Sequence, residues 1–172
     1  ALGGQVMLLT AEQKKRVCIL ARRVWAGMSD DGKRQYRNAD GGQTETQAFE
    51  LWRHAQQSAA VGRLSLSASE NDEFCILMAH FALLGGDNKT AEYWLLRFAS
   101  EERRRLFWLI KNSCTNGIEF PRYPDAIARA QYGCRLWQLG KRELLNMLST
   151  VRNRANGRKN KNNNPLQMSL GI

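Results

Sequence analysis

Residues 74–84 read FCILMAHFALL and form the longest nearly apolar run of the chain, with His80 as the polar interruption. A helix needs about 20 apolar residues to span a bilayer, so this run is too short to cross a membrane. Its length and composition favour a helix buried in a protein core. Upstream, Ser69 followed by Asp72 and Glu73 predicts a capped start. Downstream, the doublet Gly85-Gly86 predicts the end of the helix.

Apolar residues recur at the helical period on both sides of this run. Thr10 and Gln13 have the spacing of a capping box, and a helix is expected to follow to about residue 26. Further helices are expected at about residues 29–36, 46–60, 87–98, 100–114, 124–132 and 141–155. No stretch shows the sustained alternation of a β-strand. The sequence therefore predicts an all-α fold, a multi-helix globular bundle of about six to eight helices.

The length of 172 residues suits a single domain, which we expect over residues 1–155. The segment from Leu9 is similar to the segment from Ala99, because each opens with a capped, charged helix that ends at a glycine. One interpretation is a duplication, with lobes at 9–62 and 99–155 joined by a central helical segment, 69–98. The other interpretation is that the two segments are similar only because capped amphipathic helices share the same sequence pattern. From residue 156 the composition turns to Asn, Gly, Lys and Arg, which predicts a flexible basic tail over 156–172.

Lys and Arg number 26 against 16 Asp and Glu, a formal net charge of +10. This surplus favours a polyanion as partner, with nucleic acid first and an anionic membrane surface second. No acid follows Glu143, and half of the surplus lies in one stretch, made of Arg152, Arg154, Arg158, Lys159 and Lys161. We predict that this stretch contacts DNA phosphates. Secondary basic patches are predicted on two helices, at Arg103, Arg104 and Arg105, and at Lys14, Lys15, Arg16, Arg22 and Arg23. For every patch, the alternative is a solvated face without a partner.

No group of residues in the sequence has the pattern of a catalytic or metal site. His54 and His80 have no partners at metal-ligand spacing. The paired acids, such as Asp30-Asp31, fall at helix starts, where the helix dipole accounts for them. The four cysteines contain no Cys-x-x-Cys pair, which favours reduced residues in a cytoplasmic protein. We therefore predict a non-enzymatic protein with no cofactor, no metal and no membrane partner.

The last six residues, 167–172, read QMSLGI. They resemble the peptide by which bacterial replication and repair proteins dock on the DNA polymerase sliding clamp, roughly Gln-x-Ser/Asp-Leu-x-hydrophobic. The resemblance implies that Leu170 and Ile172 are apolar anchors, that the Gln167 amide bonds at the rim of the pocket, and that Ser169 fixes the extended backbone. Met168 and Ile172 depart from the commoner residues of the pattern. The alternative is that this apolar end folds back on the helical body.

The body of the chain faintly resembles the GemA-type regulatory proteins of Mu-like phages. In that family a helix leads into Met/Leu-x-Asp-Asp-x-x-Tyr-Arg; here residues 21–27 lead into Met28-Ser29-Asp30-Asp31, and Tyr36-Arg37 follow after extra residues. Residues 126–154 fit the general layout, whereas 69–98 have no counterpart. The resemblance implies a regulatory protein of a mobile element that modulates host DNA transactions. Our hypothesis is a DNA-associated accessory protein that also docks on the clamp. The alternative is a helical protein–protein adaptor without DNA binding.

Overall fold

The computed structural model describes the backbone of residues 7–37 and 42–162 and the side chains of these ranges up to residue 158. Within them the fold is all-α, as predicted, with eight α-helices. Extended pairing in these ranges is limited to one bridge, between Leu8 and Glu70. None of the described helices combines the length and the apolar character that crossing a bilayer requires. The chain divides into two compact units, residues 1–99 (unit 1) and 100–172 (unit 2).

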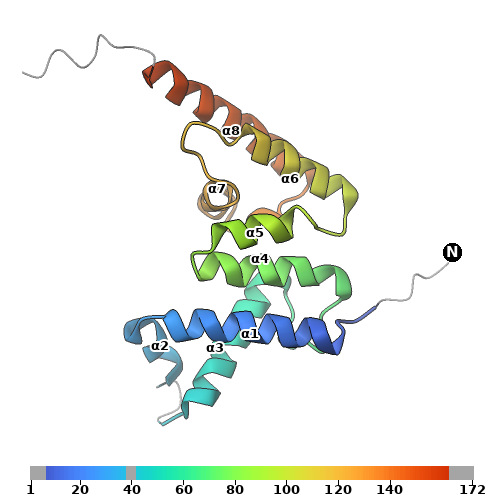
Figure 1. Cartoon of the computed structure of the whole chain (residues 1–172), viewed down its shortest axis with the longest axis vertical. Helices are drawn as coiled ribbons and strands as arrows, with labels where there is room; N and C mark the ends of the chain where they lie inside the picture. Colours follow the sequence, from blue (N-terminus) through green and yellow to red (C-terminus); the bar gives the residue numbers. More distant parts are fainter. Residues whose placement is uncertain (1–6, 38–41, 163–172) are drawn as a thin grey trace, which may run out of the picture. The chain divides into compact units, whose positions relative to one another are not determined.

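The described residues of unit 1 form five α-helices and one short 3-10 helix: α1 (Ala11–Gly27), α2 (Asp30–Arg37), α3 (Glu45–Val61), η1 (Asn71–Glu73), α4 (Phe74–Leu84) and α5 (Asn88–Leu95). Unit 2 contains α6 (Glu101–Ser113), α7 (Arg122–Tyr132), the 3-10 helix η2 (Leu136–Gln138) and α8 (Lys141–Asn162). Figure 1 shows α4 beside α1 and α5 in unit 1, with α3 crossing them.

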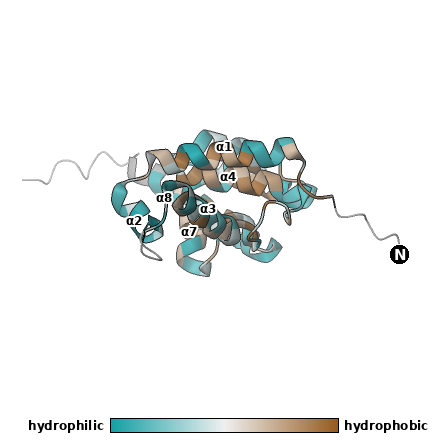
Figure 2. Ribbon diagram, turned by 90° about the horizontal axis from the view of Figure 1, so that it is seen from below, coloured by the Kyte–Doolittle hydropathy of each residue, from teal (hydrophilic) through white to brown (hydrophobic). Residues whose placement is uncertain are grey.

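Helix α4 is the core of unit 1. Eight of its eleven residues are buried, and α1, α3 and α5 pack against it. Figure 2 shows α4 as hydrophobic along most of its length, whereas α1 alternates between polar and apolar faces. The ring centroids of Trp52 on α3 and Phe81 on α4 are 5.7 Å apart, and those of Trp25 and Trp52 are 5.5 Å apart. The predicted connecting segment, 69–98, is therefore part of unit 1, because α4 supplies the surface that α1 and α3 cover.

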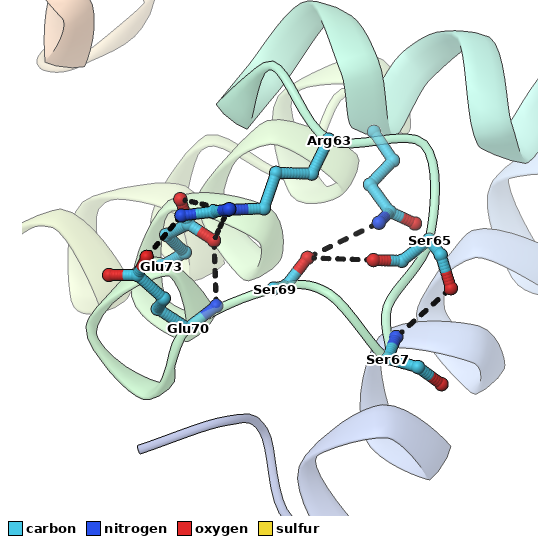
Figure 3. A network of polar contacts seen from close by, with 7 residues as sticks. Arg63, Ser65, Ser67, Ser69, Glu70 and Glu73 are labelled. Atoms are coloured by element: carbon cyan, nitrogen blue, oxygen red, sulfur yellow. Dashed lines mark hydrogen bonds and ion pairs between the residues drawn. The ribbon is translucent and has the colours of Figure 1, made fainter. Parts of the chain in front are cut away.

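The start of α4 differs from the predicted cap at Ser69. Ser69 is buried, and its hydroxyl accepts a hydrogen bond from Gln57 Nε2 on α3 at 3.3 Å (Figure 3). The first turn is held by acids instead: Glu70 N–H donates to Glu73 Oε2 at 2.8 Å. Arg63 Nε donates to both oxygens of Glu73 at 2.9 Å, and the same guanidinium pairs with Glu70. The serine therefore ties the loop to α3, because a buried hydroxyl needs a partner within the core.

In unit 2, α6 and α8 lie side by side and run in the same direction. Near their starts, Lys141 Nζ lies 2.5 Å from Glu102 Oε1, and further along Arg152 Nε donates to Ser113 Oγ at 3.3 Å. Beyond the end of α6, Asn116 Nδ2 donates to the carbonyl of Ala155 at 3.0 Å. The core between the helices is apolar, with buried Leu106, Phe107, Ile110, Leu144, Met147, Leu148 and Val151. These contacts fix the position of α8, the helix that carries the main predicted DNA-contact stretch.

Candidate nucleic-acid interface

The positive surplus belongs almost entirely to unit 2. Residues 100–172 hold 14 of the 26 basic residues and 5 of the 16 acidic ones, a net charge of +9. Residues 1–99 hold the other 12 basic and 11 acidic residues, a net charge of +1. Because unit 1 is almost neutral, long-range attraction to a polyanion originates in unit 2.

The basic stretch of α8 is more ordered than its composition predicts. The sequence predicts the end of the helix near Ala155 and a flexible tail beyond, but α8 continues to Asn162. Extending an existing helix is much easier than starting one, and the contact between Asn116 and Ala155 anchors α8 close to the predicted end. The backbones of all five predicted positions, 152 to 161, therefore lie on one helix, over a rise of about 14 Å.

Three of these five side chains are described, and all three are exposed: Arg152, Arg154 and Arg158. Arg152 donates to Ser113 Oγ, and Arg158 Nη1 donates to the carbonyl of Asn116 at 3.4 Å. The Arg158 guanidinium also lies 5.6 Å from the centroid of the Tyr123 ring. A guanidinium has five N–H groups, so each of these arginines keeps donors for a phosphate.

Helical geometry separates these arginines into two directions. Successive residues are about 100° apart around a helix, so Arg154 and Arg158 share a side, while Arg152 points elsewhere, towards α6. Within the described residues, no carboxylate pairs with any of the three. The side of α8 that carries Arg154 and Arg158 is therefore a basic surface whose charge is not locally neutralised.

Arg103 differs from the other predicted DNA contacts, because it is half-buried within unit 2. Its Nη2 group donates to the carbonyl oxygens of Trp137 and Leu139, which joins α6 to η2. Burial lowers the pKa of this guanidinium. We therefore leave Arg103 out of the proposed DNA surface. Its neighbours Arg104 and Arg105 are half-exposed and exposed, respectively, and remain candidates.

The basic residues of α1 form a separate group in unit 1. Lys14 is half-exposed and Lys15 is exposed. Lys15 and Arg22 share one side of the helix, where Arg22 lies 5.1 Å from the centroid of the Phe49 ring on α3. Arg16 and Arg23 share another side, where α1 faces α4 and α5. Because unit 1 is nearly neutral overall, we rank this group below α8 as a DNA surface.

The predicted clamp-docking residues, Gln167, Ser169, Leu170 and Ile172, lie outside the described residues. The side chains of Lys159 and Lys161 also lie outside them. In the part of the chain that is described, no three His, Cys, Asp or Glu side chains gather as a metal site would require. All four cysteines are described; each is half-buried, and none forms a disulfide.

Comparisons of the chain with protein-family models, with curated proteins and with solved structures find no match.

The placement of Arg103 predicts a structural role that its neighbour Arg105 lacks. Replacing Arg103 with Ala leaves the part-buried carbonyls of Trp137 and Leu139 without their charged donor. We therefore expect a loss of about 2 kcal/mol in the free energy of unfolding. The matched variant Arg105→Ala removes an exposed charge and is expected to cost less than about 0.5 kcal/mol. Urea unfolding followed by circular dichroism measures both. Equal stability of the two variants would contradict the structural role of Arg103.

Proposed function

We propose that this chain is a non-enzymatic, cytoplasmic accessory protein that binds DNA phosphates through α8 of unit 2. The observation that carries the proposal is the net charge of +9 on unit 2, together with the unneutralised side of α8 at Arg154 and Arg158. A protein that neutralises phosphates with Lys and Arg releases condensed counterions, which drives binding without reading the base sequence.

The contact is made by side chains rather than by the helix end. The C-terminus of a helix carries a partial negative charge and presents carbonyls, so the backbone there does not attract a phosphate. The exposed side chains of Arg152, Arg154 and Arg158 instead extend from α8, and the next basic residues of the same helix are Lys159 and Lys161. This arrangement supports affinity for DNA of any sequence, and we assign no helix to reading bases in a groove.

We further propose that the terminal peptide docks on the sliding clamp, with Leu170 and Ile172 as anchors and Gln167 and Ser169 as polar contacts. The support is the resemblance of residues 167–172 to the clamp-binding pattern. Two weak contacts on one chain strengthen each other through effective concentration, so clamp and DNA together would retain the protein better than either alone. The resemblance to GemA-type proteins supports a regulatory role in a phage or other mobile element.

The alternative function is a helical adaptor whose basic surface serves an acidic protein partner. It predicts weak DNA binding at physiological salt and no response to the α8 arginines. The following experiment separates the two functions.

The DNA prediction concerns the double variant Arg154→Gln/Arg158→Gln. We expect it to bind a labelled duplex more weakly than the wild type and to lower the slope of log K against log salt by about 1.8, because each lost phosphate contact removes about 0.9. Fluorescence anisotropy at four or more salt concentrations measures the slope. The control variant Arg34→Gln/Lys89→Gln also removes two charges, both exposed, but from unit 1.

If the two double variants lower the slope equally, the binding depends on net charge and not on α8. If the wild type shows no salt dependence, the phosphate contact itself is refuted and the adaptor function is favoured.

The clamp prediction concerns Leu170→Ala/Ile172→Ala in the intact chain. Truncation after Arg154 would also remove the last turns of α8, including the contacts of Arg158, so point variants are the sharper test. We expect the double variant to lose at least about tenfold in affinity for purified clamp, because both apolar anchors are removed. Surface plasmon resonance measures the affinity, and Asn163→Ala serves as the control. Unchanged clamp binding, or no binding by the wild type, would refute the docking peptide.

A further inference from the structure

A groove in unit 1 lies where α1 leaves part of α4 and α5 uncovered. One hollow of about 340 Å³ opens between α1 and the end of α4, and its apolar lining includes Leu20, Val24, Met28, Phe81 and Leu84. A second hollow of about 310 Å³ lies between α1, α4 and α5, and its lining includes Ile19, Met78 and Trp94. Leu20, Arg23 and Asp87 line both hollows, so the two form one groove along α1.

The floor of this groove is an apolar stripe that unit 1 does not cover. Leu20 and Val24 lie four residues apart on α1, Met28 follows directly after the end of the helix, and each of the three is half-exposed rather than buried. At the edges, Leu84 is 38% exposed and Ile19 is 43% exposed. Gly85 lines the groove as well, and a Cβ there would lie 3.0 Å from Val24 Cγ2, so a side chain at this position would crowd the floor. A helical stripe of this kind is normally covered by another element.

The rim of the groove is positive. Arg16 and Arg23 are two turns apart on α1, about 10 Å along its axis, and neither pairs with a carboxylate among the described residues. Arg16 is held in place over Trp94, with its guanidinium 5.4 Å from the ring centroid. The acid in the lining is Asp87, which caps α5: its carboxylate accepts hydrogen bonds from Thr90 N at 3.0 Å and Thr90 Oγ1 at 2.6 Å.

We propose that this groove binds an amphipathic helix of a partner protein, with an apolar stripe flanked by Asp or Glu. The part of α1 from Arg16 to Gly27 spans about 17 Å, which matches about three turns of a docked helix. Apolar anchors at helical spacing would cover Leu20, Val24 and Met28, and acids on one flank would meet Arg16 and Arg23. Met28 and Met78 add flexible, polarisable contacts that adapt to the anchors.

Charge and chemistry favour this occupant over the other candidates. The chain's own end, residues 163–172, contains no Asp or Glu side chain to meet Arg16 and Arg23. A nucleic acid carries a phosphate at every nucleotide, so some phosphates would lie beside ionised Asp87, whereas a docked helix can place an uncharged side chain there. The hydrogen bonds from Thr90 hold the pKa of the Asp87 carboxyl below its ordinary value. The apolar floor between the rim arginines and Asp87 also offers a phosphate backbone no donors of its own.

The test uses the intact protein and synthetic peptides labelled with fluorescein. The probe is a peptide of about 14 residues with Leu at helical spacing and Glu along one flank, and its twin carries Lys in place of each Glu. We expect saturable binding of the acidic peptide and binding of the basic twin that is at least about tenfold weaker. Arg23→Glu and Leu84→Glu are each expected to weaken binding of the acidic peptide by about tenfold or more. Arg23→Glu reverses the charge of the rim, and Leu84→Glu places a charge on the apolar edge.

Matched controls keep the test specific. Leu51 on α3 is 42% exposed and lines neither hollow, so Leu51→Glu should leave the affinity within about twofold, as should Arg34→Glu. Arg23 is exposed, so Arg23→Glu is expected to fold even if Leu84→Glu does not. The variant Arg154→Gln/Arg158→Gln should keep its affinity for the acidic peptide, because both residues belong to unit 2, which separates this proposal from the DNA function.

The proposal is overturned if the acidic peptide shows no saturable binding up to about 1 mM, or if the basic twin binds equally well. It is also overturned if a peptide of residues 163–172 or a single-stranded oligonucleotide binds the groove more tightly than the acidic helix. Equal losses in Arg23→Glu and Arg34→Glu would show that net charge, and not the groove, accounts for binding.

Discussion

The burial of α4 is the constraint on which unit 1 depends. A helix that is apolar almost all round must be covered on every side, because each exposed Leu, Ile or Phe side chain forgoes about 1.5–3 kcal/mol of burial. The chain meets this need with α1, α3 and α5, and with the aromatic cluster around Trp52 and Phe81. Leu20 and Val24 of α1, and Met28 just beyond its end, stay half-exposed beside α4, and the groove opens there. The groove is thus a direct consequence of how α4 is enclosed.

The division into two units changes the interpretation of the charge. A net charge of +10 spread evenly over the chain would say little about where a polyanion binds. Here, +9 of that charge lies on residues 100–172. Unit 1 combines a nearly balanced charge with an apolar groove, and unit 2 combines a long basic helix with a compact apolar core. In our account the two units therefore have different partners: a protein helix for unit 1 and a phosphate backbone for unit 2.

Local signals predicted most of the helices. The Thr10–Gln13 capping box begins α1 as the sequence predicts, and the helices expected at about 46–60 and 124–132 end in the structure at Gly62 and Gly133, both left-handed. The same logic misplaced the cap at Ser69, since the spacing Ser-x-x-Asp/Glu does not reveal that the serine is buried against Gln57. The sequence analysis also predicted the end of α8 too early, because composition does not reveal the hydrogen bond from Asn116, which is distant in sequence, to Ala155. Arg103 could not be separated from Arg104 and Arg105 for the same reason: its carbonyl partners lie more than 30 residues away.

The assignment of DNA binding to unit 2 is tested most directly by backbone amide NMR of the intact, ¹⁵N-labelled chain during titration with a short DNA duplex. The account predicts shift changes at amides of α8 from Arg152 onward, which diminish as salt is raised, and none along α1, α4 and α5. Shifts centred on α1 near Lys14 and Lys15, with α8 unaffected, would contradict it.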